Sequence, residues 1–341
     1  MQPASGAAGS PDSTTPLATT PAPHPVSPAA AAGPEPDLPV TWAEYRAAAV
    51  LASAFVATIL LAILFAEPFL AAGLQAFEDP NDVGNALYYI VAILAFTAII
   101  LAIAKWGKKG LIRWIILGSV GLTIWYVIHP VLLITLGWSA GAAYGLAAIL
   151  GVLSVVALYF HPEWYVIDVV GLLVAAGTAA IFGISLDVRV VIALLVGLAV
   201  YDAIAVYKTK HMLSLADTVI DLRLPVLLVI PKVAGYRFRD EASKFKEAKP
   251  ENKGEREAMF MGLGDLVMPT ILVVSALQFS KPGWEGMPAL GAAVGTLVGY
   301  AVLMGYVLKG RPQAGLPLLN GGSIVGFLTG LFAATGSIVF W

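Results

Sequence analysis

The sequence contains no cysteine and few charged residues. Only 12% of its 341 residues are Asp, Glu, Lys or Arg, whereas soluble domains carry about 25%. The absence of cysteine excludes disulfides, thiolate nucleophiles and Cys-ligated zinc or iron–sulfur centres. The four histidines form no HExxH pair and there is no GxxxxGK[ST] motif. These absences argue against a zinc protease and a P-loop nucleotide site.

Hydrophobic residues make up 59% of the chain, and they occur in long uncharged runs. A helix that crosses a bilayer needs about 20 mostly apolar residues, and we count nine such runs. The sequence therefore predicts an all-α polytopic membrane protein of about nine transmembrane helices. The predicted spans are 47–66, 83–104, two within 114–162, 169–186, 190–207, 258–280, 286–308 and one starting near Leu316.

The third and fourth spans share one uncharged stretch of 49 residues, 114–162. We place the turn between them at 137–141, where glycines cluster, with His129-Pro130 as the alternative break or a kink. In spans eight and nine, glycines recur at every fourth position, which predicts close helix packing within the fold. These glycines are Gly291, Gly295 and Gly299 in span eight and Gly322, Gly326 and Gly330 in span nine.

Two segments do not resemble membrane spans. Residues 1–40 hold ten of the 22 prolines and predict a disordered tail. Residues 208–257 form a charged loop with one β-prone run, 224–230, bracketed by prolines. The expected organisation is a tail (1–40), spans one to six (41–207), a loop (208–257) and spans seven to nine (258–341).

The positions of the basic residues predict the orientation. With nine spans and the N-terminus inside, 18 of the 20 Lys and Arg residues lie on the inner side. Basic loops stay in the cytoplasm, so we expect an integral multi-pass membrane protein with a cytoplasmic N-terminus and an extracellular C-terminus. The 208–257 loop is then cytoplasmic.

Two acidic residues, Asp202 and Asp265, lie well inside predicted spans, and Asp168 lies at the start of span five. No Lys or Arg within the spans can pair with them. An ionisable group in the bilayer costs a few kcal/mol and is a functional candidate by default. Two such acids suggest an acid/base pair or a path for protons or cations, and a purely structural role is the third alternative.

The residues around the two acids form recognisable motifs. Asp202 follows a tyrosine, Asp265 ends a Gly-Leu-Gly-Asp sequence, and a Pro-Leu-Leu sequence opens span nine. The chain thereby resembles the presenilin / signal peptide peptidase family of intramembrane aspartyl proteases, which has YD on span six, GxGD on span seven and PAL at span nine. The resemblance covers all nine spans but not the tail, and leucine replaces the family's alanine. It implies that Asp202 and Asp265 are catalytic, and that the following residues support the site or bind substrate: Tyr201, Gly262, Leu263, Gly264, Pro317, Leu318 and Leu319.

The chemistry agrees with this resemblance. Peptide hydrolysis by two carboxyls needs one ionised group to take a proton from water and one protonated group to polarise the carbonyl. Two close carboxyls share a proton in this way, and either aspartate can be the base. No metal or organic cofactor is implied. Gly262 and Gly264 allow spans six and seven to approach closely, or serve general helix packing. Tyr201 either hydrogen-bonds near the site or faces lipid.

We therefore expect an intramembrane aspartyl endopeptidase that hydrolyses peptide bonds within transmembrane helices by a two-aspartate acid/base mechanism. The alternative is a proton- or cation-coupled transporter or leak channel that uses the same pair, although no convincing internal repeat supports it. The expected partners are transmembrane peptide substrates and the lipid bilayer, not nucleic acid. The sequence requires no accessory subunits and leaves the oligomeric state open. We expect an unwound substrate to add as a strand, either to 224–230 or to the backbone near Pro317 and Leu319. The alternative for 224–230 is a hydrophobic loop on the membrane surface.

Overall fold

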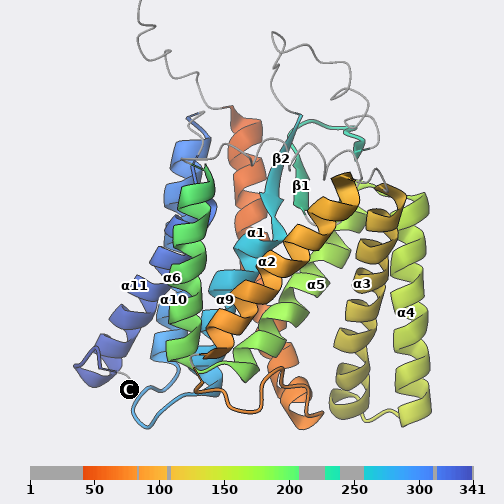
Figure 1. The fold of residues 1–341 in the computed structure, drawn as a ribbon. Coiled ribbons are helices and arrows are strands. Elements are labelled where there is room, and N and C mark those ends of the chain that lie inside the picture. Colours follow the sequence, from red (N-terminus) through yellow and green to blue (C-terminus); the bar gives the residue numbers. More distant parts are fainter. Residues whose placement is uncertain are drawn as a thin grey trace, which may run out of the picture. The chain divides into compact units, whose positions relative to one another are not determined.

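The computed structural model describes residues 41–82, 84–105, 109–206, 227–238, 257–309 and 313–339. Within these ranges the chain forms nine α-helices, the π-helical segment η1 and two strands (Figure 1). The elements are α1 (Trp42–Ala71), α2 (Gly84–Lys105), α3 (Lys109–Pro130), η1 (Val131–Thr135), α4 (Ala140–Phe160), α5 (Trp164–Ser185), α6 (Val188–Ile204), β1 (Leu227–Pro231), β2 (Ala258–Gly262), α9 (Leu263–Gln278), α10 (Met287–Val307) and α11 (Gly315–Thr335).

The nine helices confirm the predicted fold class. Six of those in the described ranges are long and apolar enough to cross a membrane, and two shorter apolar helices cover 84–100 and 263–278. The turn expected at 137–141 is confirmed, because α4 begins at Ala140 after a short connection. At His129-Pro130 the chain does not turn but passes from α3 into η1.

The seventh span differs from the prediction. The sequence suggested a helix over 258–280, but residues 258–262 form β2, which pairs antiparallel with β1, and the helix α9 begins only at Leu263. Non-helical backbone at membrane depth is tolerated where protein covers it, and Ala258, Met259 and Met261 of β2 are buried. The β-prone run is confirmed for 227–230. Its residues 224–226, the tail 1–40 and most of the loop 208–257 lie outside the described residues.

The helix α9 is the central helix of the membrane body. It contacts α1, α5, α6, α10 and α11, and nearly all of its residues from Leu266 to Ala276 are buried. A helix that is hydrophobic on all sides belongs in such an interior position. Asp265 lies in the first turn of this helix, near its N-terminus.

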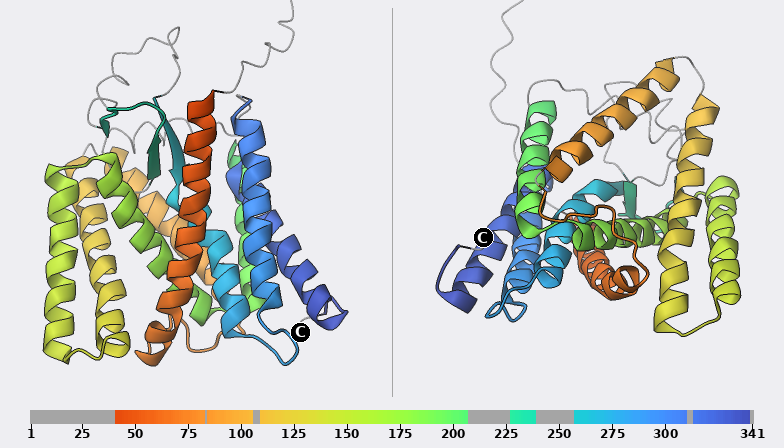
Figure 2. Two further views of the ribbon diagram at one scale, coloured as in Figure 1. Left: turned by 180° about the vertical axis from the view of Figure 1, so that it is seen from behind. Right: turned by 60° about the horizontal axis from the view of Figure 1, so that its bottom comes forward.

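Helices α10 and α11 pack backbone against backbone. A Cβ atom added at Gly295 would overlap the backbone of Gly322 and Gly326, and Gly291 and Gly299 also face α11 backbone. The predicted close packing of these glycine-rich spans is therefore confirmed. Figure 2 shows α10 and α11 side by side, while α3 and α4 pair at the opposite edge of the helical body.

Several helices begin or end in the same part of the molecule as the two strands. In Figure 1 the start of α1, the two strands, the end of α6 and the start of α11 lie in the upper part, and the end of α11 lies in the lower part. The sequence motifs occur at the end of α6, at the beginning of α9 and at the beginning of α11. The fold thus brings the three motifs toward one region.

Candidate active site

Asp202 lies near the C-terminal end of α6 and is 6% exposed. Its Oδ2 accepts a hydrogen bond of 3.1 Å from the backbone N–H of Leu316 in α11. The first N–H groups of a helix have no partner within the helix, and the helix dipole favours an anionic group there. The first turn of α11 therefore holds the Asp202 carboxyl by its backbone.

Asp265 lies in the first turn of α9 and its carboxyl faces Gly315, the first residue of α11. A Cβ atom added at Gly315 would lie 3.3 Å and 3.4 Å from the two carboxyl oxygens of Asp265 and 3.5 Å from its Cγ. On the other side, a Cβ at Gly262 would lie 3.5 Å from Oδ2 of Asp265. The Asp265 carboxyl thus occupies a space bounded by two residues without side chains.

The two carboxyls converge on one dipeptide, Gly315-Leu316. Sequence reasoning placed the ninth-span contribution at Pro317, Leu318 and Leu319 and missed these two residues. The available signal was their position immediately before Pro317, where a helix begins and leaves backbone N–H groups for other partners.

The glycines of the Gly-Leu-Gly-Asp sequence do not bring α6 and α9 together. A Cβ at Gly264 would meet no atom within 4 Å, and a Cβ at Gly262 would meet only Asp265. The interpretation of close helix approach is therefore wrong for both. Gly262 leaves room for the Asp265 carboxyl, and Gly264 faces open space one residue before it. Leu263 is buried and packs on Gly171 of α5.

The other predicted residues differ in their exposure and in the helices that they contact. Tyr201 is 53% exposed, and its side chain makes no hydrogen bond within the described residues, which agrees with the lipid-facing alternative. The backbone of Leu318 and Leu319 packs against Gly299 of α10, and Pro317 lies beside them in the first turn of α11. In this structure these residues fix the position of α11, while Leu316 makes the contact with Asp202.

The strands β1 and β2 form a two-stranded sheet, so each strand has one edge hydrogen-bonded to its partner and one outer edge that faces away from it. The N–H of Lys232 donates to the carbonyl of Glu257 at 2.8 Å, and in the observed register Val229 lies opposite Phe260. Bonded and non-bonded pairs alternate in an antiparallel ladder, so Val229 and Phe260 direct their N–H and C=O groups outward, away from the partner strand.

Two of the three outward positions of β1 have no free N–H to offer another strand. The outward N–H of Val229 donates to Oδ1 of Asp168 in α5 at 2.8 Å, and Pro231, at the next outward position, has no N–H. At the outer edge of β2, no hydrogen bond to Phe260 beyond the ladder is present within the described residues. The chain continues from β2 directly into α9, so this outer edge leads to Asp265.

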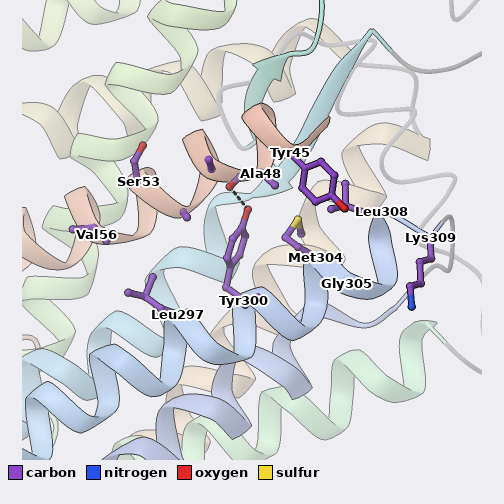
Figure 3. A pocket seen from close by; sticks show the side chains of 13 residues that line it. Tyr45, Ala48, Ser53, Val56, Leu297, Tyr300, Met304, Gly305, Leu308 and Lys309 are labelled. Carbon is purple, nitrogen blue, oxygen red and sulfur yellow. Dashed lines mark hydrogen bonds between the residues drawn. The ribbon is translucent and has the colours of Figure 1, made fainter. Parts of the chain in front are cut away.

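A cavity between two helices of the described residues is separate from this site. It has a volume of about 580 Å³ and lies between α1 and α10, with Tyr300 on one wall donating a hydrogen bond of 2.6 Å to the carbonyl of Ala48 on the other (Figure 3). Its lining is mostly apolar and includes neither aspartate. The described residues contain no group of three His, Asp or Glu side chains arranged to hold a metal ion.

The fold and the site define a polytopic membrane protein with two carboxyls brought together by three helices. Comparison with known proteins identifies the family within this class. The family model described as "Signal-peptide peptidase, presenilin aspartyl protease" matches residues 52–336. No match was found among the curated proteins compared with the chain.

Two solved structures are similar over most of the chain. Both are described as a presenilin family intramembrane aspartate protease, one in a C222 and one in a P2 crystal form. The first is 38% identical, with a TM-score of 0.64, and the match covers 84% of this chain and 99% of that one. The second is 40% identical, with a TM-score of 0.62, and the match covers 84% and 97%.

The chain belongs to the signal-peptide peptidase and presenilin family of aspartyl proteases. It is an integral, multi-pass membrane protein and an intramembrane aspartyl protease, whose substrates are transmembrane segments.

Proposed function

We propose that Asp202 and Asp265 hydrolyse peptide bonds of transmembrane substrates as an acid/base pair. The observation that carries the proposal is the convergence of both carboxyls on Gly315-Leu316. Asp202 accepts a hydrogen bond of 3.1 Å from Leu316, and the Asp265 carboxyl lies where a side chain at Gly315 would press on it. The remaining acids of the described helices do not meet in this way. Asp168, for example, bonds to the strand β1.

In this mechanism the ionised carboxyl takes a proton from a water molecule, and the water oxygen attacks the scissile carbonyl carbon. The protonated carboxyl donates its hydrogen bond to the carbonyl oxygen and stabilises the charge that develops there. A proton then passes to the leaving nitrogen as the C–N bond breaks. Either aspartate can begin as the base, because the pair shares one proton.

The experiment changes Asp202→Asn and Asp265→Asn separately and measures cleavage of a model transmembrane peptide in detergent. We expect both variants to lose turnover. Asp187→Asn is the matched control, since Asp187 caps the other end of α6 and asparagine caps equally well. Wild-type turnover in either active-site variant would refute the acid/base pair. Ion flux through wild-type liposomes without any cleavage would instead support the transporter or channel.

We further propose that the unwound substrate adds as a strand to the outer edge of β2. The sequence suggested 224–230 or the backbone near Pro317 as the acceptor, but the outer edge of β1 is occupied by Asp168 and lacks a donor at Pro231. Main-chain hydrogen bonds to β2 would give affinity with little dependence on the substrate sequence. They would also place the substrate backbone beside the start of α9.

Replacing Phe260 by proline tests this placement, because the N–H of Phe260 points away from β1 and its loss leaves the β1–β2 ladder intact. One lost hydrogen bond to the substrate predicts a fall of about tenfold in kcat/KM. Phe260→Leu is the control that keeps the N–H. Equal turnover of the proline and leucine variants would remove β2 as the acceptor edge.

We propose a cytoplasmic N-terminus, an extracellular C-terminus and substrates that enter with their N-termini outside. The placement of 18 of the 20 basic residues on one side supports this orientation. Because the chain has no cysteine, single cysteines report topology without background. An impermeant maleimide added to intact cells should label Ser280→Cys and leave Ser10→Cys unlabelled, and the reverse pattern would invert the topology.

The same proposal divides the chain into a tail (1–40), six spans (41–207), a cytoplasmic loop (208–257) and three spans (258–341). It requires no accessory subunit and no cofactor. Gly262 then leaves room for the Asp265 carboxyl, and Leu263 packs this turn of the chain on α5. Pro317, Leu318 and Leu319 position the start of α11, while Tyr201 and Gly264 are exposed beside the two aspartates in the chain. Purified protein that cleaves the model peptide by itself would bear out the independence from accessory subunits.

A further inference from the structure

Two acidic residues at the start of α5 are buried and take no part in the proposed hydrolysis. Glu163 is 9% exposed and Asp168 is 8% exposed. Glu163 stands at the N-cap of α5, yet its side chain does not cap that helix. Buried carboxylates are retained only where they are hydrogen-bonded, so their partners indicate what they do.

Both carboxylates accept hydrogen bonds from the chain that contains β1. Oδ1 of Asp168 accepts from the N–H of Val229 at 2.8 Å, and Oε2 of Glu163 accepts from the N–H of Phe238 at 3.3 Å. No ion pair of Asp168 is present within the described residues. Val229 and Phe238 are themselves 1% and 2% exposed and pack in a second hydrophobic cluster with residues of α3 and α5.

The bond from Asp168 differs from an ordinary contact because of its place in the ladder. The N–H of Val229 points away from β2, so it donates a hydrogen bond to the Asp168 carboxylate without disturbing the pairing of the strands. Asp168 therefore attaches the sheet to a membrane helix at a defined residue. Through the ladder this bond also connects β2, and with it the first turn of α9, to α5.

We propose that Asp168 is a positioning residue, which fixes the β1–β2 sheet against α5 and thereby determines which peptide bond of a strand-bound substrate reaches Asp265. The proposal rests on the proposed strand addition at β2. Glu163 assists by holding the segment that follows β1.

The register explains why a small displacement has a large effect. A strand advances about 3.3 Å per residue, and a misplacement of about 1 Å of the reacting groups can cost a factor of about 100 in rate. A sheet that is no longer held at Val229 would present neighbouring bonds of the substrate to the aspartates. The products should then spread over several cut sites.

The test compares variants by kcat, by KM and by mass spectrometry of the products from one transmembrane peptide. Asp168→Leu removes the acceptor, and we expect kcat to fall at least tenfold and the cut sites to spread over adjacent bonds. Asp168→Asn retains an acceptor oxygen and should restore the wild-type cut sites. Glu44→Gln is the matched control, because Glu44 forms an ion pair of 2.9 Å with Lys232 just after β1 and does not touch the strand edge.

A purely structural role would lower the thermal stability of Asp168→Leu and leave its cut sites unchanged, which would overturn the proposal. If Asp168→Leu does not fold, Asp168→Glu decides. Its carboxylate keeps the hydrogen bond on an arm one methylene longer, so a shifted cut site supports positioning and an unchanged one refutes it.

Hydrogen exchange separates this proposal from the proposed function, because it needs no catalysis. Exchange of the amides in 227–230 should accelerate about tenfold in Asp168→Leu and remain slow in Asp168→Asn. Unaltered exchange in Asp168→Leu would refute the anchor whether or not the protein cleaves. Inactive wild-type protein whose exchange follows the predicted pattern would count against the proposed hydrolysis alone.

Discussion

Gly315→Ala gives the sharpest test of the site geometry. The added methyl would lie 3.3 to 3.5 Å from the three carboxyl atoms of Asp265. Ordinary van der Waals separation begins at about 3.5 Å and is comfortable near 4 Å. The Asp265 carboxyl must therefore move by a few tenths of an ångström.

The size of the effect follows from the cost of misplacement. If about 1 Å costs a factor of about 100, a shift of a few tenths predicts a fall in kcat of about 4- to 10-fold, which corresponds to roughly 1 kcal/mol in the barrier. KM should stay unchanged, because Gly315 acts on the aspartate and not on the proposed strand site at β2. The assay is steady-state cleavage of a model transmembrane peptide in detergent.

Gly321→Ala is the matched control, since Gly321 lies in the same helix and a Cβ there would meet no atom within 4 Å. We expect this variant to cleave like the wild type. Equal kcat values for the two alanine variants would refute the reasoning that Gly315 defines the position of the Asp265 carboxyl.

Two further predictions concern packing. Gly295→Val should lower Tm by several degrees, because overpacking costs about 1–3 kcal/mol, and should reduce turnover, because α11 carries the Leu316 amide that binds Asp202. The control Gly305→Ala lies in the same helix with open space around it and should melt like the wild type. Equal melting temperatures of the two variants would contradict the close α10–α11 contact. Tyr300→Phe removes the buried hydrogen bond to the Ala48 carbonyl. The free energy of unfolding should fall by about 1 kcal/mol, which lowers Tm by roughly 2 °C and leaves kcat unchanged. An unaltered Tm would show that this hydrogen bond does not stabilise the contact between α1 and α10.

Much of the fold could be predicted from the sequence because the bilayer imposes a length and a composition on every span. Uncharged runs of about 20 residues identified nine helices, and the scarcity of charge made Asp202 and Asp265 conspicuous. The β-prone run was recognisable from its branched residues and flanking prolines, although its partner was not. Residues 258–262 are as apolar as a membrane helix, and only their pairing with β1 makes them a strand.

The position of each side chain relative to the others required the tertiary structure. A motif such as Gly-Leu-Gly-Asp shows which residues recur together, but not what their missing side chains make room for. Gly262 faces Asp265 itself and Gly264 faces open space, so neither lies at a helix contact. The sequence places Asp168 at the start of span five, but only the tertiary structure shows that it accepts a hydrogen bond from Val229, 61 residues away in the chain.

The sequence by itself determined the membrane class, the number of spans and the two candidate aspartates, because hydropathy and buried charge are local properties of the chain. The tertiary structure decided that Gly315 and Leu316 complete the site, that Asp168 occupies the outward N–H of Val229 in β1 and that the edge of β2 leads to Asp265. The first two features depend on contacts between residues at least 50 positions apart, such as Leu316 and Asp202, which lie 114 residues apart. The third depends on the pairing of β2 with β1. No local pattern specifies them, since they depend on how α6, α9 and α11 pack.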